Sequence, residues 1–317
     1  MSEPGKVTLL AGGIGGSRMA EGFAALDSVE LTVIGNIADD DEFHGLWVSP
    51  DIDTMIYTLS GRIDRNQGWG VADEGCRAIN TLAELGAATW MFLGDRDFGL
   101  HIYRTERLRK GDRPTEITFD IADRLGCPVR VVLPTDDTVQ TRVKTADGWL
   151  SFQRYFVENQ HSVPVEEVLY EGIENAKPTP EALTAIAEAD LIVFAPSNPV
   201  ASISPILAIP GITDALSQVS APIIAISPII GGKVMKGAAD AMMRGLGLRA
   251  DALGVAEYYA GLARTFLIDT ADAWLSAGIA DLGLRPVVTD ILMPDIEGKK
   301  RLARQVLECS APASWGI

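Results

Sequence analysis

The first forty residues contain an uninterrupted succession of strand, glycine turn, helix and strand. The apolar run 6–11 precedes the cluster Gly12-Gly13-Ile14-Gly15-Gly16, a helical pattern over 17–26 and a second apolar run over 31–36. Two strands joined in this way lie parallel in a sheet. Four more short apolar runs, each bounded by Pro, Gly or Asp, occupy 129–133, 191–195, 223–227 and 265–268. We predict one Rossmann-like, doubly wound α/β domain over residues 1–317, with a mostly parallel sheet.

One region departs from this pattern. Residues 138–145 and 149–157 alternate between polar and apolar, and Asp147-Gly148 between them is typical of a hairpin turn. The alternation predicts a small antiparallel β insertion at about 136–172.

Charge and cysteine content limit the partners and the compartment. The 27 Lys and Arg stand against 43 Asp and Glu, a formal net charge of −16, which argues against nucleic acid as a partner. Three cysteines are too few for a disulfide framework, and residues 1–6 lack the basic start and apolar run of a secretory signal. These features predict a cytoplasmic protein with a frayed tail from Ser310 onward.

The segment 191–213 contains no charged residue and is long enough to span a bilayer. It contains four prolines, however, and an uninterrupted helix does not tolerate that number. We expect a buried strand that leads into an uncharged loop, and no membrane partner.

The glycine cluster at 12–16 predicts a phosphate site. Glycines let the backbone approach a ligand closely, and the free N–H groups at a helix start bind anions. The spacing matches neither the GxGxxG dinucleotide fingerprint nor a P-loop. The alternative is a tight turn that packs against the sheet.

Six carboxylates fall within fifteen positions where the second strand ends. They are Asp39, Asp40, Asp41, Glu42, Asp51 and Asp53. Crowded carboxylates repel one another unless a cation or a proton intervenes, and ligands that are all oxygen suit Mg²⁺. We predict a metal or substrate site here, with Asp41 and Glu42 merely exposed; the alternative is a solvated acidic loop.

Two later loops follow predicted strands at the same edge of the sheet. They are Pro196-Ser197-Asn198-Pro199 and Ser227-Pro228-Ile229-Ile230-Gly231. Their hydroxyl, amide and backbone N–H groups could bind a base or sugar together with phosphate oxygens. Two proline-rich turns are the alternative.

Other polar groups have two interpretations. Gly94-Asp95-Arg96-Asp97 is either functional or a turn held by a local Asp–Arg pair. The basic residues Arg104, Arg107, Arg109, Lys110 and Arg113 either bind an acidic substrate group or form a solvated face. The histidines at 44, 101 and 161 are isolated in sequence, which favours structural roles.

These motifs together closely resemble the 2-phospho-L-lactate transferase (CofD) family. The resemblance extends from about Lys6 to beyond Glu257. It rests on the glycine cluster, Asn36-x-x-Asp39-Asp40, Ser49-Pro50-Asp51-x-Asp53-Thr54, Gly94-Asp95-Arg96-Asp97, the two loops above and Gly254-Val255-Ala256-Glu257-Tyr258-Tyr259. Archaeal members tend to carry a basic residue where this chain has Phe92, so the chain is more similar to the bacterial branch.

The resemblance implies a Mg²⁺-dependent step in the synthesis of coenzyme F-420. A phospho-acid unit (2-phospho-L-lactate, phosphoenolpyruvate or 3-phosphoglycerate type) passes from a guanylyl diphosphate donor to the ribityl hydroxyl of the deazaflavin Fo, and GMP leaves. A homodimer is the family expectation. The alternatives are a YvcK-like regulatory protein that binds nucleotide sugars and, less well matched, a dinucleotide-dependent oxidoreductase.

The resemblance also assigns roles to residues. Asp53 and Asp40 are the expected catalytic residues, and Asp53 is also expected to meet Fo. The expected metal ligands are Asp39, Asp40, Asp51 and Asp53. The residues expected to bind the donor nucleotide are Gly12, Gly13, Gly15, Gly16, Ser197, Asn198, Ser227 and Gly231.

Overall fold

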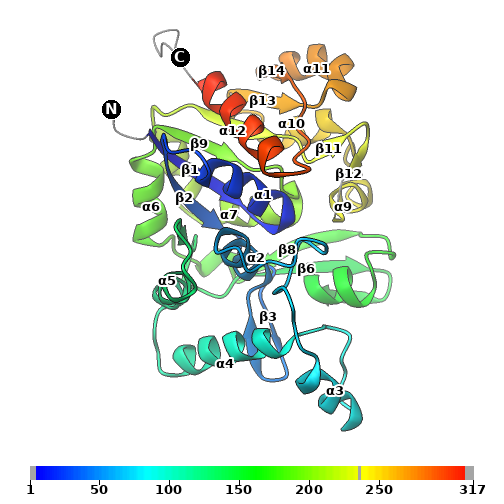
Figure 1. The fold of residues 1–317 in the computed structure, drawn as a ribbon. Coiled ribbons are helices and arrows are strands. Elements are labelled where there is room, and N and C mark those ends of the chain that lie inside the picture. Colours follow the sequence, from blue (N-terminus) through cyan, green and yellow to red (C-terminus); the bar gives the residue numbers. More distant parts are fainter. Residues whose placement is uncertain (1–4, 235–236, 311–317) are drawn as a thin grey trace.

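The computed structural model describes residues 5–234 and 237–310, and it is built around a seven-stranded parallel sheet (Figure 1). The order is β14-β13-β10-β9-β1-β2-β5. These strands are β1 (Gly5–Ala11), β2 (Val29–Gly35), β5 (Arg130–Val132), β9 (Leu191–Phe194), β10 (Ile223–Ile226), β13 (Thr265–Ile268) and β14 (Arg285–Val288). The predicted doubly wound α/β fold is confirmed.

Strand β14 was not predicted from the sequence. It contains Arg285 and Pro286 and forms one edge of the sheet, where it is partly exposed. Proline is tolerated at an edge because a ladder hydrogen bond is needed on one side only. The central strands β9, β10 and β13 are buried throughout, as their continuous apolar runs indicate.

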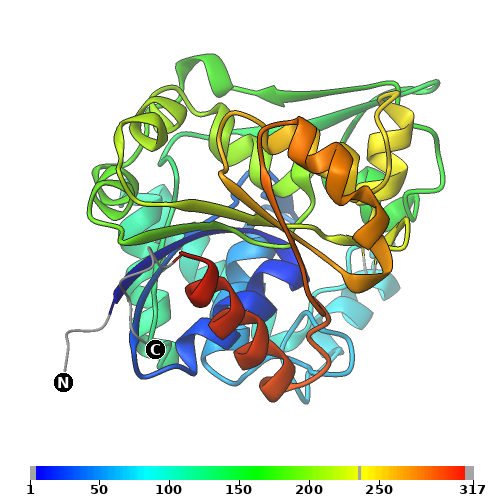
Figure 2. The same cartoon turned by 90° about the horizontal axis from the view of Figure 1, so that it is seen from above.

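Helices cover both faces of the sheet. Helix α1 packs against α12 and α2 on one face, and α6 packs against α8 on the other (Figure 2). The α-helices are α1 (Gly13–Ala24), α2 (Pro50–Leu59), α3 (Arg77–Glu84), α4 (Asp95–Arg109), α5 (Pro114–Leu125), α6 (Pro180–Ala187), α7 (Ser204–Ala208), α8 (Ile212–Gln218), α9 (Ala239–Gly245), α10 (Ala252–Tyr259), α11 (Ser276–Asp281) and α12 (Ile296–Ser310).

The remaining elements are short. They are the hairpin β3 (Asp41–Phe43) and β4 (Leu46–Val48), the pair β11 (Ile229–Ile230) and β12 (Lys233–Val234), the π-helical segments η1 (Arg154–Glu158) and η3 (Pro199–Ile203), and the 3₁₀ segments η2 (Ile173–Asn175) and η4 (Thr270–Leu275). A small apolar cluster that includes Phe43, Ile79 and Phe98 joins the β3–β4 hairpin to α3 and α4, the elements that lie below the sheet in Figure 1.

The antiparallel insertion lies where it was predicted. Strands β6 (Gln140–Thr145), β7 (Gly148–Ser151) and β8 (Glu167–Glu171) form a sheet in the order β7-β6-β8. The predicted second strand is too long, however, because Arg154 to Glu158 coil into η1. Phe152 and Phe156 stack there with ring centroids 5.5 Å apart, an arrangement that alternating strand positions do not give.

The uncharged segment 191–213 begins with the buried strand β9, as predicted. It then continues as η3 and α7 instead of an irregular loop, because the Asn198 side chain accepts hydrogen bonds from the Val200 and Ala201 N–H groups. No single described helix is long and apolar enough to cross a membrane. The segment η3–α7 and helix α8 together have the length and composition of a span, but they are bent by 81° relative to each other. Residues 1–4, which belong to the segment that lacks a secretory signal, lie outside the described residues. Most of the predicted frayed tail, residues 311–317, also lies outside them.

Candidate active site

The site forms where the sheet changes winding direction. Strand β1 lies between β2 and β9, and ligands of such sheets collect at the carboxyl ends of the strands that meet at this point. Two hydrogen bonds join the turn after β1 to the loop after β9 at this point. Gly12 N donates to Ser197 Oγ at 3.2 Å, and Ser197 Oγ donates to Gly12 O at 2.7 Å.

A cavity of about 830 Å³ opens beside this contact. Its walls come from the glycine turn, α2, α4, the residues 90–93 and 291–294, the η1 region and the loops after β9 and β10. The size is that of a site for a small molecule or cofactor. Most of the predicted site residues line it, which places segments from far apart in the sequence around one space.

The glycine turn serves both packing and ligand access. Helix α1 begins at Gly13, which has a φ of +60° that suits glycine, and a Cβ on Gly15 would collide with the Pro196 carbonyl oxygen. Gly12, Gly13 and Gly15 line the cavity, whereas Gly16 packs against the Ala11 Cβ. Because an α-helix leaves its first N–H groups without intrahelical partners, this turn can bind an anion.

Asp39 and Asp51 are the acidic pair at this turn. Both are buried and line the cavity, and the Asp51 Oδ2 accepts a 2.9 Å hydrogen bond from Asn36 Nδ2. Asp39 Oδ1 is buried and has no hydrogen-bond partner among the described residues. Burial raises the pKa of Asp51 to about 6, and burial together with the Asp51 charge raises the pKa of Asp39 well above its usual range. A cation would stabilise both carboxylates.

Asp40 points into a different environment. Its Oδ2 accepts hydrogen bonds from Ser49 Oγ at 2.7 Å and from Trp47 Nε1 at 3.1 Å, and burial raises its pKa well above the usual range. The residues that line the cavity include its neighbour Asp39 and not Asp40. The catalytic and metal roles of Asp40 stay predictions. Asp41 and Glu42 lie in β3; Glu42 is exposed, as expected, whereas Asp41 is half-buried.

Asp53, two residues after Asp51 on α2, also lines the cavity and is paired with a buried arginine. Arg104 Nη1 donates to Asp53 Oδ2 at 3.1 Å, and Nη2 donates to Oδ1. His101 Nδ1 lies 3.3 Å from Arg104 Nη1. Burial lowers the pKa of His101 to about 4, so the imidazole is neutral at pH 7. Asp53 therefore meets the cavity as part of an ion pair, and its metal role stays a prediction.

The predicted turn at 94–97 is the start of α4. Arg96 Nη1 donates to the Ala72 carbonyl at 2.8 Å, so the predicted local Asp–Arg pair is replaced by contacts with a neighbouring loop. Asp97 instead turns into the cavity, where Tyr57 Oη donates to its Oδ1 at 2.9 Å. Burial raises the pKa of Asp97 to about 6.

The polar side chains of the two later loops mostly hold the loops themselves. Asn198 caps η3, and Ser227 Oγ donates to the Ile229 carbonyl at 2.9 Å and accepts from its N–H at 3.1 Å. Gly231 N donates to Asp272 Oδ2 at 2.9 Å. The cavity is lined by Ser197, Asn198 and Ser227. These loops therefore form part of its wall, and their side chains already make hydrogen bonds within the protein.

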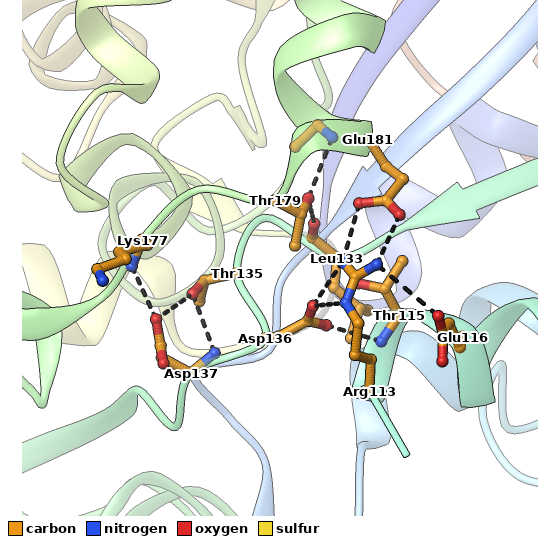
Figure 3. A network of polar contacts seen from close by, with 11 residues as sticks. Arg113, Thr115, Glu116, Leu133, Thr135, Asp136, Asp137, Lys177, Thr179 and Glu181 are labelled. Carbon is orange, nitrogen blue, oxygen red and sulfur yellow. Dashed lines mark hydrogen bonds and ion pairs between the residues drawn. The ribbon is translucent and has the colours of Figure 1, made fainter. Parts of the chain in front are cut away.

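Four of the five basic residues between 104 and 113 pair with acids of the chain, and Arg109 donates to the Gly45 carbonyl instead. Arg104 pairs with Asp53, and Arg107 pairs with Asp112 and Asp120. Figure 3 shows that Arg113 binds Asp136 and Glu181, which joins α5 to the start of α6. The hypothesis that this cluster binds an acidic substrate group is therefore not supported, because acids of the protein pair with four of its members and none of the five lines the cavity.

Several cavity residues were not recognised from the sequence. Arg104, which the sequence placed in a basic cluster, is 4% exposed and contacts the cavity-lining Asp53, and His101, which was assigned a structural role, lines the cavity. Aromatic side chains also form much of the wall: Trp69, Trp90, Phe92, Phe152 and Phe156. The available signals were the i, i+4 pairs Phe152 and Phe156 and, within α4, Asp97 and His101.

Comparisons with known proteins add to this geometry. A sequence model of the family described as "2-phospho-L-lactate transferase CofD" matches residues 7–307. A protein named phosphoenolpyruvate transferase from Streptomyces coelicolor is 41% identical over 309 residues, which cover 95% of this chain and 97% of that protein. A protein of the same name from Kitasatospora aureofaciens is 41% identical over 319 residues, or 98% and 99% of the two chains.

A solved structure shares the fold. A Bacillus halodurans protein of the UPF0052 family superposes with a TM-score of 0.64 at 17% sequence identity, covering 97% of this chain and all of that one. This likeness concerns the fold alone.

Proposed function

This chain belongs to the 2-phospho-L-lactate transferase CofD family, and from that premise we propose how its cavity accommodates the two substrates. The chain is a transferase of coenzyme F-420 biosynthesis. Relatives at 41% identity are named phosphoenolpyruvate transferases, so the donor proposed here is guanylyl diphosphate-linked phosphoenolpyruvate. The acceptor is the ribityl hydroxyl of Fo, and GMP is released. A homodimer and a cytoplasmic location are further predictions.

The donor's diphosphate is proposed to lie on the glycine turn. The observation that carries this placement is the juxtaposition of the α1 start, whose first N–H groups have no intrahelical partner, with the carboxylates of Asp39 and Asp51. The guanosine part would extend toward the loops after β9 and β10, near Ser197, Asn198 and Ser227.

Asp39 and Asp51 are the residues that would hold a magnesium ion beside the diphosphate. Among the described residues no three His, Cys, Asp or Glu side chains gather into a complete metal site. Mg²⁺ commonly binds one or two carboxylates and completes its shell with substrate phosphates and water. The orphaned Asp39 Oδ1 supports such a role. When bound, the ion would supply positive charge that offsets the charge of the diphosphate and of departing GMP.

The acceptor is proposed to lie against the aromatic side of the cavity. Trp69, Trp90 and Phe92 offer flat apolar surface for a deazaflavin ring, and Asp53 lines the same cavity from α2. A carboxylate that is paired with arginine still has free acceptor sites, so Asp53 can receive a hydrogen bond from the ribityl hydroxyl. The buried ion pair fixes the position of that carboxylate.

The reaction then requires alignment more than acid–base strength. The hydroxyl oxygen forms a bond to the phosphorus that carries the acid, and the bond from that phosphorus to the bridging oxygen of GMP breaks. Asp53 orients the hydroxyl, accepts its proton as the new bond forms and passes that proton to water. The helix start holds the diphosphate in line with it.

The direct test supplies purified protein with Fo, Mg²⁺ and each of three guanylyl diphosphate donors, carrying phosphoenolpyruvate, 2-phospho-L-lactate or 3-phosphoglycerate. Mass spectrometry of the product identifies the transferred acid. We expect the phosphoenolpyruvate product to form fastest. Preferred use of another donor would overturn the proposed donor, and no product from any donor would contradict the activity.

A further inference from the structure

Five polar side chains face one another across two helices on the acceptor side. Asp53 and Tyr57 are four residues apart on α2, and Asp97, His101 and Arg104 follow at intervals of four and three on α4. Residues at these spacings share one face of a helix. All five are buried, and all but Arg104 line the cavity.

Arg104 determines which nitrogen of His101 carries the proton. A guanidinium has donors only, and Arg104 Nη1 lies 3.3 Å from His101 Nδ1 and 3.1 Å from Asp53 Oδ2. The Nδ1 atom must therefore present its lone pair to Arg104. In the neutral ring the proton then resides on Nε2.

The Nε2–H group has no partner in the described part of the protein. The hydrogen bond and the close ion contact of His101 both involve Nδ1. The neighbouring Tyr57 hydroxyl donates its proton to Asp97 and so does not compete for a ligand's acceptor atom. A side chain that is only 2% exposed thus presents an unused donor at the cavity wall.

The charge around His101 indicates what this donor recognises. Two carboxylates, Asp53 and Asp97, stand against the single guanidinium of Arg104, so this wall disfavours a diphosphate. A neutral acceptor atom on a flat heterocycle, such as a ring carbonyl oxygen, matches a neutral N–H donor beside aromatic side chains.

We propose that His101 is a binding residue that donates its Nε2–H to an uncharged carbonyl oxygen or ring nitrogen of the planar acceptor substrate. Arg104 is the positioning residue that fixes the imidazole in this tautomer while it holds Asp53. This inference rests on the proposed placement of the acceptor, and it adds a specificity determinant to that placement.

The tautomer of His101 can be determined by NMR spectroscopy without an activity assay. The chain has three histidines, so a sample labelled with ¹⁵N-histidine gives three ring spin systems, and His101→Gln identifies the one from His101. At pH 7 we expect a protonated Nε2 and an unprotonated Nδ1 for His101. A protonated Nδ1 in the wild-type protein would overturn the proposal, whether or not an Arg104 variant folds.

Kinetics test the contact itself. His101→Gln keeps a side-chain N–H donor, whereas His101→Leu removes it, and His44→Asn, in the β3–β4 turn outside the cavity, is the matched control. We expect the Leu variant to raise KM for Fo about tenfold, the effect of one lost hydrogen bond, with KM for the nucleotide donor unchanged. The Gln variant should recover most of the affinity.

Two outcomes separate this inference from the proposed function. An unchanged KM for Fo in a folded Leu variant, or equal losses for both substrates, would refute the role of His101 while the wild-type enzyme still makes product. If the wild-type protein makes no product from any donor, the proposed function fails. Fo binding by fluorescence quenching, compared between the wild type and the two variants, then tests His101 alone.

Discussion

At the scale of single residues, the acidic pair Asp39 and Asp51 is the point where function opposes stability. Each carboxylate is buried beside the other, and the pKa of Asp51 lies at about 6. A folded-state pKa above the unfolded value means that the ligand-free protein gains stability as pH falls through 6 and loses it as pH rises. A ligand-binding site explains why such a pair is retained.

The variant Asp51→Asn should reveal how much the buried charge of Asp51 lowers the stability of the folded protein. Without Mg²⁺ at pH 8, we expect the variant to be more stable than the wild type by on the order of 1 kcal/mol, because the unfavourable charge is gone. The difference should shrink toward pH 5, where Asp51 of the wild type is protonated. Thermal unfolding at the two pH values measures it, with Asp41→Asn in β3 as control. A less stable variant at pH 8 would contradict the account.

A second residue-scale prediction concerns the acceptor hydroxyl. Asp53→Asn keeps the size of the side chain but weakens both the contact with Arg104 and the acceptor for the hydroxyl. We expect kcat to fall about 100-fold, within the range for a positioned acid–base group. GMP release in the presence of Fo and saturating Mg²⁺ is the assay. Turnover near the wild-type rate would remove Asp53 from the reaction.

At the scale of elements, the antiparallel insertion holds the acidic loop in place. Gln153 Nε2 donates to the Asp39 carbonyl at 2.9 Å, Gln140 Nε2 donates to the Asp40 carbonyl at 2.8 Å, and Thr141 N donates to the Ala38 carbonyl at 2.7 Å. The insertion therefore contributes to the site although its strands lie outside the main sheet.

Replacing Gln153 by Met should test this support. The change leaves a buried carbonyl without its donor, and we expect a loss of stability of about 1–3 kcal/mol. The apparent affinity for Mg²⁺ should fall as Asp39 loses its fixed position. Gln218→Met, on the exposed end of α8, is the matched control. Unchanged Mg²⁺ dependence in the Gln153 variant would show that the insertion has no part in the site.

Arg113, which joins α5 to α6 through ion pairs, is predicted to contribute little to stability or to donor binding. Arg113→Ala removes a partly exposed ion-pair network (Figure 3), and we expect a stability loss below about 1 kcal/mol. KM for the nucleotide donor should stay within about twofold, because the network lies apart from the residues that line the cavity. A large increase in that KM would restore the hypothesis that the basic cluster binds substrate.

The sequence was most informative where local pattern determines structure. The buried strands, the glycine turn before α1 and the insertion are each encoded by contiguous residues, and each is found close to its predicted range. Pairs such as Asp53 and Arg104 are 51 positions apart, so only the packing of α2 against α4 reveals that the arginine is buried. The hydrogen bonds that commit Asn198 and Ser227 to their own loops likewise depend on turn geometry.

At the scale of the whole molecule, one cavity presents two chemically different sides. The side at the glycine turn combines helix N–H groups with two carboxylates that a cation would stabilise. The rest of the lining includes aromatic surface, an arginine-paired carboxylate and a neutral histidine. This division suits a reaction that joins a charged nucleotide donor to a flat, neutral acceptor.

The most direct measurement is a crystal structure with the guanosine diphosphate moiety of the donor and Mn²⁺ in place of Mg²⁺, located by its anomalous signal. The account predicts the ion about 2.1 Å from oxygens of Asp39 and Asp51, with phosphate oxygens on the N–H groups of Ile14 and Gly15. An ion bound elsewhere, or a diphosphate away from the start of α1, would contradict it.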